Sequence, residues 1–178
     1  GPGFKNVTES TSFLDSLNFD PDTRTAEIDA GVDFMLYYPI YNQFIFYFSN
    51  KTRYLDQFSD KDKNAVFFEN ELYRFGGASS LRGFDENAFH ASVYSIQNIE
   101  LRYLFERHSA FYVFWNGAYY YKNVNQQVTE DFPWGFGIGA DFETTAGIFT
   151  LSYALGKQFD NLFEFRTAKI HFGYVSRF

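Results

Sequence analysis

The sequence contains no cysteine, four prolines and a single methionine among its 178 residues. The absence of cysteine excludes disulfide bonds and thiolate metal sites, although it selects no particular compartment. Positive charge is also scarce, with 15 Lys and Arg against 22 Asp and Glu. Because nucleic-acid binding requires clustered Lys and Arg to neutralise phosphates, we expect no nucleic-acid partner.

Long apolar runs are missing as well. A membrane-spanning helix requires about 18 or more consecutive apolar residues. The richest apolar stretch, 34–48, is interrupted by Pro39, Asn42 and Gln43, so the sequence excludes insertion as a helix. We expect the opening Gly1-Pro2-Gly3 to be a remnant of protease cleavage, with a leader or an upstream domain removed before it.

Aromatic residues, in contrast, are abundant. The chain has 25 Phe and 14 Tyr, yet its mean hydropathy is only -0.32. A soluble protein would need a very large core to bury this much Phe. A transmembrane β-barrel resolves the conflict, because its lipid face can be aromatic while alternate residues stay polar.

Apolar and polar residues alternate in eight runs, which predicts eight β-strands of about the length that crosses a bilayer. Alternate positions of the first run, from Ala26 to Leu36, are apolar, and acidic residues and a glycine lie between them. The runs cover residues 26–36, 42–54, 64–75, 93–106, 110–122, 134–143, 146–157 and 165–178. We expect residues 1–23 to form a polar N-terminal segment, either a tether or a weaker extra strand, and residues 24–178 to form one barrel domain.

The alternation predicts an all-β protein, a transmembrane antiparallel β-barrel with eight strands per chain. In lipid a sheet cannot leave its edge N–H and C=O groups unpaired, so it must close on itself or on a partner. The alternative is a soluble barrel of the lipocalin type, with the aromatic faces inside. That arrangement would place Gly135, Gly137 and Gly139 on the outer surface, where they fit poorly.

Between the third and fourth runs lies the loop "GGASSLRGFDE", which contains Leu81-Arg82-Gly83-Phe84. The strand before it ends in Phe75-Gly76-Gly77. This combination resembles the [V/L]RG[F/Y] loop of the BamA/TamA/FhaC superfamily of outer-membrane barrels. The resemblance implies that the loop folds back into the lumen and that Arg82 contacts polar residues of the next two strands. Glu100 matches the acidic position of that family, and Asn116 stands where the family often has Asp.

A guanidinium enclosed in the lumen needs a partner, and a pair between Arg82 and Glu100 would satisfy both ions. The alternative is that Arg82 is a solvated loop residue without a fixed partner.

The C-terminus resembles the aromatic-terminated assembly signal of bacterial barrels. His171, Gly173 and the terminal Phe178 match that signal, whereas Ser176 occupies its apolar position. The resemblance extends from about residue 24 to the end. It corresponds to the second half of a sixteen-stranded barrel, with three strands before the loop and five after it, and without the family's POTRA domains.

Half a barrel can close in three ways: alone, with a second copy, or as part of a larger protein from which it was excised. An eight-stranded barrel has an interior just filled by side chains, so a loop from Gly76 to about Ala91 needs more room. We therefore favour a homodimer of half-barrels that seals both edges.

The expected function is non-enzymatic: an integral protein of the bacterial outer membrane, in contact with its lipid, that helps client polypeptides insert or cross. The alternatives are a small pore or structural barrel and a lipid-modifying barrel enzyme. The enzyme would need a Ser/His/Asp cluster at one rim, but His90, His108 and His171 are scattered. We predict no catalytic residue, metal site or cofactor, and interpret Trp134 and Tyr119–Tyr121 as an interfacial aromatic girdle.

Overall fold

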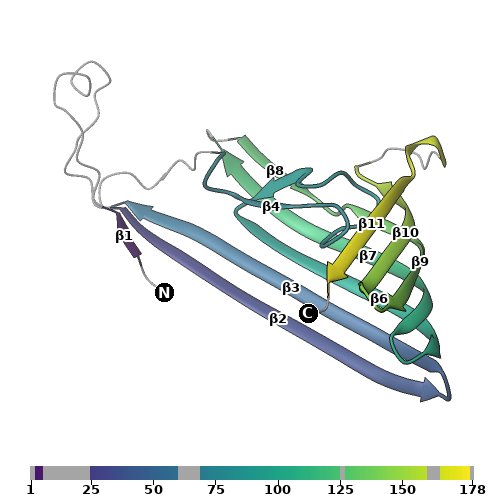
Figure 1. Ribbon diagram of the computed structural model, residues 1–178. Coiled ribbons are helices and arrows are strands. Elements are labelled where there is room, and N and C mark those ends of the chain that lie inside the picture. Colours follow the sequence, from purple (N-terminus) through teal and green to yellow (C-terminus); the bar gives the residue numbers. More distant parts are fainter. Residues whose placement is uncertain (1–2, 6–24, 60–68, 125–126, 160–164, 177–178) are drawn as a thin grey trace.

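The computed structural model describes residues 3–5, 25–59, 69–124, 127–159 and 165–176. They form a large antiparallel β-sheet and a small two-stranded sheet (Figure 1). No α-helix occurs in these ranges, where the helical structure is one 3-10 turn, η1 (Phe165–Thr167). The strands are β1 (Gly3–Lys5), β2 (Thr25–Tyr41), β3 (Phe44–Ser59), β4 (Tyr73–Phe75), β5 (Phe89–Ala91), β6 (Val93–Glu106), β7 (Ser109–Val124), β8 (Gln127–Asp131), β9 (Trp134–Thr144), β10 (Gly147–Lys157) and β11 (Lys169–Ser176). The all-β prediction is confirmed.

The strands of the large sheet follow the order β1-β2-β3-β6-β7-β9-β10-β11, and β8 also pairs with β7. β8 and β9 pair with successive parts of β7, and Pro133 lies in the interruption between them. The Ala118 amide still donates to the Pro133 carbonyl at 2.9 Å. Because proline has no N–H to donate, it is accommodated where regular pairing is interrupted. β8 and β9 therefore act as one long strand with a break.

Short turns connect β2 to β3, β6 to β7 and β9 to β10 at one end of the sheet (Figure 1). Asn42 in the first turn has a φ of 48°, a conformation that Asn tolerates better than most residues. The connections from β3 to β6 and from β10 to β11 lie at the opposite end and are long. The sheet therefore has a short-turn end and a long-loop end.

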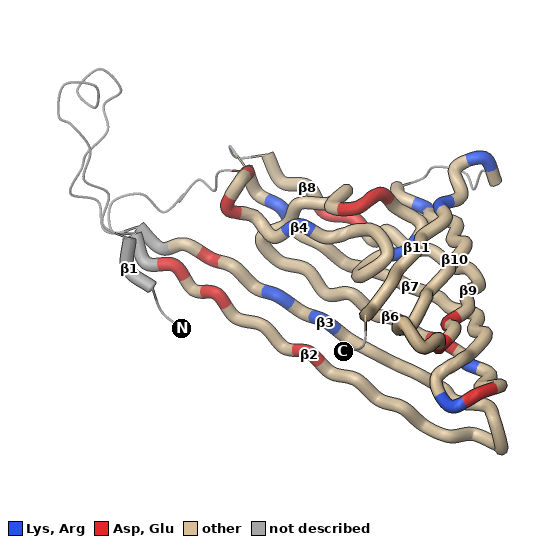
Figure 2. The backbone as a smooth tube through the Cα atoms, in the orientation of Figure 1, with Lys and Arg blue, Asp and Glu red and all other residues tan. Residues whose placement is uncertain are grey.

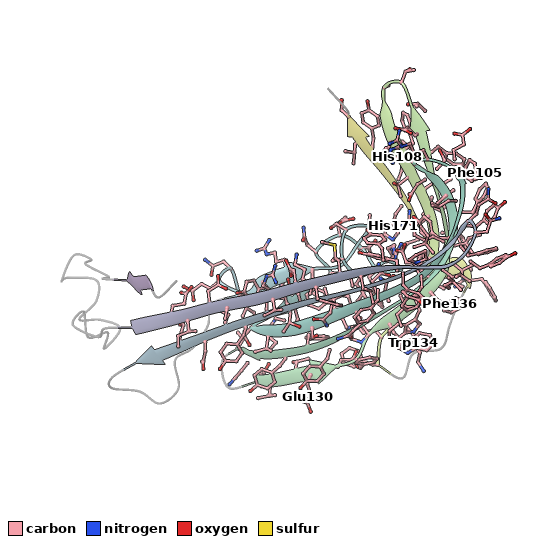
Figure 3. All side chains as sticks on the ribbon, turned by 90° about the horizontal axis from the view of Figure 1, so that it is seen from below. Phe105, His108, Glu130, Trp134, Phe136 and His171 are labelled. Atoms are coloured by element: carbon pink, nitrogen blue, oxygen red, sulfur yellow. The ribbon has the colours of Figure 1, made fainter. Side chains whose placement is uncertain are left out.

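The sheet is curved, and the alternation of side chains separates its two faces (Figure 3). Phe105 and Phe136 lie on the convex side, whereas His171 lies on the concave side. One register row crosses the convex face from β2 to β11 with only apolar and aromatic residues: Tyr38, Phe46, Leu101, Val113, Ile138, Tyr153 and Ile170. Charges are confined to other rows. Figure 2 shows acidic positions along β2 beside basic positions on β3, and among them Arg53 pairs with Asp33 at 2.5 Å.

The hydrophobic core lies on the concave face, between the sheet and the segment from β4 to β5. Its members are buried and mostly aromatic. They are Phe75, Leu81, Phe89, Ala91, Tyr94, Ile96, Ala118 and Tyr120. The segment from β4 to β5 thus packs against the concave face of the sheet.

The strand predicted over residues 64–75 is wrong for residues 69–72; within the described part of that run only Tyr73–Phe75 form a strand, β4. Residues 69–72 form a turn, and β4 pairs only with β5, so that β3 pairs directly with β6 in the large sheet. The apolar side chains that suggested a strand are instead buried: Leu72 packs on Leu55, and Phe75 packs on Phe89. Residues 60–68 lie outside the described ranges.

The girdle interpretation also needs one correction. Tyr119 is exposed on the convex face, but Tyr120 is a core residue on the concave face, 5% exposed. Its ring packs on Phe75 and Phe89. Successive residues of a strand point to opposite faces, so the three consecutive tyrosines cannot form one girdle.

The two ends of the sheet, β1 and β11, do not pair with each other in the described residues. β1 covers only Thr25–Glu27 of β2, and no other strand in the described part of the chain pairs with that edge. The structure is an open, curved antiparallel sheet.

Candidate functional site

The loop between β4 and β5, residues 76–88, folds over the concave face and is called here the Arg82 loop. It turns at Gly76 and Gly77, whose φ angles of 122° and 87° favour glycine. Its conformation is held by hydrogen bonds within the loop. The Gly77 amide donates to the Leu81 carbonyl at 3.1 Å, and the Ala78 amide donates to Glu86 Oε1 at 2.7 Å. The loop is therefore a folded unit that presents Arg82 to the sheet.

The Arg82 side chain reaches the middle of β6 and β7. Its Nη2 donates to Glu100 Oε1 and to Asn98 Oδ1, both at 2.6 Å, and its Nε donates to Asn116 Oδ1 at 3.1 Å. Arg82 is 8% exposed and Glu100 3%. The structure thus brings together Arg82, Glu100 and Asn116, the three residues that the sequence associated, and adds Asn98 to them.

A second arginine extends the network across the sheet. Arg102 Nη1 donates to the other Glu100 oxygen, Oε2, at 2.7 Å, and its Nη2 contacts Asp141 on β9. Thr150 on β10 donates to Asp141 Oδ1 at 2.9 Å. The network therefore runs from the Arg82 loop to β10. Its two guanidinium groups and two carboxylates alternate along it, so their charges balance.

Two aromatic rings of β7 complete the surroundings of the guanidinium groups. The Arg82 Cζ lies 3.6 Å from the centre of the Phe114 ring, and the Arg102 Cζ lies 4.7 Å from the centre of the Tyr112 ring. A ring face attracts a cation, and the attraction is stronger where water is excluded. The rings thus stabilise the buried guanidinium of Arg82 and the half-buried guanidinium of Arg102, and partly shield both from solvent.

Glycines of β9 make room for these rings. A Cβ added to Gly137 would lie 2.7 Å from Phe114 Cζ, and a Cβ on Gly139 would overlap the Tyr112 ring. A Cβ on Gly135 would lie 2.6 Å from the Arg82 carbonyl oxygen. These alternating glycines would fit poorly on the outside of a soluble barrel. In the structure they lie on the concave face, beneath the two aromatic rings and the Arg82 loop.

The tip of the loop reaches the last two strands. The Gly83 amide donates to His171 Nε2 at 3.3 Å, and Lys169 Nζ lies 2.7 Å from Asp85 Oδ1. Gly83 has a φ of 95°, and a Cβ there would meet the backbone of β10 at 2.8 Å. The loop consequently contacts five neighbouring strands of the sheet, from β6 to β11.

The remaining predicted residues have different positions. Leu81 is fully buried in the core, and Phe84 packs on Phe89. Gly173 lies in β11, where a Cβ would find only ordinary contact with Thr150. Phe178 lies outside the described residues. Of the two assembly-signal residues that the structure describes, His171 contacts the Arg82 loop.

Sequence reasoning missed Asn98, Arg102, Asp141, Tyr112 and Phe114. A signal for two of them was present, because Asn98 and Arg102 lie two residues either side of Glu100 and therefore share its face. Asp141 could not be found this way, since its contact with Arg102 depends on the registers of β7 with both of its neighbours.

The site is suited to holding the loop in place. Every buried side-chain nitrogen or oxygen in the described residues has a hydrogen-bond partner. A pocket of about 250 Å³ lies beside the network, lined by Tyr37, Tyr47 and Ser80 among others. In the same described ranges no group of three or more His, Asp or Glu side chains could hold a metal ion.

Comparisons of the chain with protein-family models, with curated proteins and with solved structures give no match. Within the described ranges, no helix has the length and apolar character needed to span a membrane.

Proposed function

We propose that this chain is an integral β-barrel protein of the bacterial outer membrane. The supporting observation is the convex band, the outward-facing alternate residues within 32–38, 44–48, 99–105, 111–115, 134–142, 149–153 and 170–174, none of which is charged. Large side chains in it are exposed, for example Ile138 at 60% and Phe172 at 67%. An exposed apolar surface of this extent is unfavourable in water and is expected against lipid.

The convex band has a polar border at the long-loop end. There Asn50 donates to Ser95 at 3.0 Å, Thr52 lies 2.9 Å from Ser95, and Gln97 donates to Ser95 at 2.9 Å. The opposite border is aromatic, because Phe105 packs on Phe111 and Phe142 near the short turns. Aromatic rings favour the membrane–water interface. The positions of the two borders therefore support contact between the convex band and a single lipid bilayer.

Bacterial barrels have short periplasmic turns and longer extracellular loops. We accordingly orient the short-turn end towards the periplasm and the long-loop end towards the exterior. In this orientation the Arg82 loop enters the lumen from outside.

The role that we propose is to help polypeptides insert into or cross the outer membrane, without enzymatic chemistry. The resemblance of Leu81-Arg82-Gly83-Phe84 to the BamA/TamA/FhaC loop supports it, as does the buried network that braces the loop. The unpaired edges of β2 and β11 also support it, since an unpaired edge is a template for another strand.

The test is a liposome assay in which the folding of an eight-stranded client barrel is followed with wild-type protein and with Arg82→Ala. We expect the wild type to accelerate client folding and Arg82→Ala to reduce the acceleration. If wild-type protein co-floats with the liposomes but does not accelerate folding, the chain is a structural or pore-forming barrel. Failure to associate with liposomes would contradict the membrane proposal itself.

We further propose that a second copy completes the barrel. The eight strands from β1 to β11 alternate in direction, so β1 of one copy is antiparallel to β11 of the next. A single copy cannot roll up tightly, because the Arg82 loop and the core occupy the concave face, whereas an eight-stranded barrel encloses side chains only. A mass measurement in detergent tests this proposal. A protein with the mass of one 20.8 kDa chain at every concentration would contradict it.

A further inference from the structure

Four features of the described residues are candidates for a further role: the open edge of β2, the pocket beside Arg102, the polar border of the convex band, and the contact between the loop tip and β11. Nothing in the structure indicates which chain covers the β2 edge, and the pocket is part of the network already described. The polar border is satisfied by its own hydrogen bonds. The loop-tip contact alone combines a titratable side chain, a buried backbone donor and an edge strand.

The hydrogen bond between Gly83 and His171 requires one protonation state. The Gly83 amide is the donor, so His171 Nε2 must accept with its lone pair, and the imidazole must be neutral with its proton on Nδ1. If Nε2 gained a proton, two donors would face each other. Gly83 is buried, and a buried N–H that loses its acceptor is destabilising.

Few other contacts hold β11 to the Arg82 loop. The pair between Lys169 and Asp85 is solvent-exposed, with the Asp85 side chain 76% exposed, so it is screened and weak.

We propose that Gly83 and His171 form a pH-sensitive latch that ties the Arg82 loop to the edge strand β11. At neutral pH the latch is closed. Protonation of His171 opens it and releases the loop tip from β11, while Arg82 stays held by Glu100. The charged groups around His171 are Arg82, Asp85 and Glu86 of the loop and Lys169 of its own strand. On β10 its register partner is Ser152, which does not titrate.

The experiment measures the distance between two spin labels in the full chain folded in detergent micelles. One label is attached at Ala88→Cys in the loop and the other at Val175→Cys on β11. Both positions are exposed, and the chain has no cysteine of its own to compete. We expect a narrow distance distribution at about pH 7.5 and a broader one, shifted to longer distances, at about pH 4.5, well below the ordinary histidine pKa of about 6.5.

The matched variants assign the change to one histidine. His171→Gln keeps an uncharged acceptor at every pH, so its distribution should be the same at both pH values. His90→Gln and His108→Gln should keep the wild-type response, since His90 contacts Glu69 and His108 lies in the turn after β6. The proposal is overturned if wild-type protein shows the same distribution at both pH values, or if His171→Gln still responds. The first of these results is measured on protein that keeps all three histidines, so it does not depend on whether a histidine variant folds.

Discussion

Glu100 is shared by two arginines, one on each oxygen of its carboxylate. Arg82 has two neutral amide partners besides it, Asn98 and Asn116, whereas Arg102 also has the carboxylate of Asp141. Glu100 is consequently the only carboxylate that Arg82 contacts in the described residues. A buried ion pair of this kind contributes little relative to an apolar substitute, but removing one partner leaves the other charge buried and uncompensated.

Glu100→Gln should therefore destabilise the protein strongly. We expect a loss of about 3–5 kcal/mol in the free energy of unfolding, because the charge of Arg82 stays buried without a counter-ion. Urea titration of the protein folded in micelles, followed by tryptophan fluorescence, measures this loss.

Asp33→Asn is the matched control, since it neutralises the carboxylate of a different arginine–carboxylate pair on the concave face. That pair, Arg53 with Asp33, is exposed, with the Asp33 side chain 52% accessible. Water and salt screen such a pair, so its loss should have a much smaller effect. Equal effects of the two substitutions would contradict the view that the Glu100 network is a buried anchor.

The sequence allowed only part of the Glu100 network to be predicted. Arg82 was singled out by the unusual loop around it, and Glu100 by its match to the acidic position of the family that the loop resembles, together with its place on the polar face of an alternating strand. The positions of Tyr112 and Phe114 could not be inferred, because their strand is aromatic on both faces and alternation does not reveal its orientation. The role of Gly83 as a donor to His171 depends on how far the loop reaches, which no local pattern contains.

Among the elements, β9 is the one whose composition is explained by its neighbours. Gly135, Gly137 and Gly139 alternate with large apolar residues, so one face of the strand has no side chains from Gly135 to Gly139. Glycine within a strand weakens it but allows close approach of another group. Here the rings of β7 and the backbone of the Arg82 loop pack against these three glycines.

Gly137→Ala should destabilise the protein by about 1–3 kcal/mol, the usual effect of overpacking a well-packed region. Its Cβ would meet the Tyr153 carbonyl oxygen and Phe114 Cζ, and the backbone atom cannot move aside easily. The same urea titration measures the change. Gly173→Ala on β11 is the control, because its Cβ would have Thr150 Cβ at 3.6 Å, an ordinary contact. We expect the control to stay within about 0.5 kcal/mol of wild type.

Alternation predicted the strands well wherever several apolar residues repeat on one face. The runs at 26–36, 42–54, 93–106 and 146–157 correspond to β2, β3, β6 and β10, although β2 and β3 are longer than expected. Within the described part of the run at 64–75 it failed for residues 69–72, because a segment that packs across a concave face also needs frequent apolar residues. Leu72 and Phe75 satisfy that need without a regular strand, and β4 is only three residues long.

At the scale of the whole molecule, the two faces of one sheet have opposite chemistry. The concave face has Asp33, Arg53, Glu100, Arg102 and Asp141, all of them in ion pairs. The convex band has no charge from β2 to β11. A soluble sheet exposed to water on its outer side would show the reverse pattern, with polar side chains outward. This separation of charge is the physical basis of the membrane proposal, and it can be tested with one pair of substitutions.

Ile138 and Tyr37 are both 60% exposed, but Ile138 lies on the convex face and Tyr37 on the concave face. If the convex band contacts lipid, Ile138→Lys should cost about 2–4 kcal/mol in vesicles, the usual penalty for a lysine on the lipid face near the middle of the bilayer. Tyr37→Lys should cost much less, because its ammonium group would lie beside the pocket of the polar lumen. The measurement is the free energy of folding into phospholipid vesicles, compared with the same variants in dilute detergent. Because exposure is equal at the two positions, water as the outer solvent would make both substitutions nearly neutral, and that result would remove the basis for placing this sheet in a membrane.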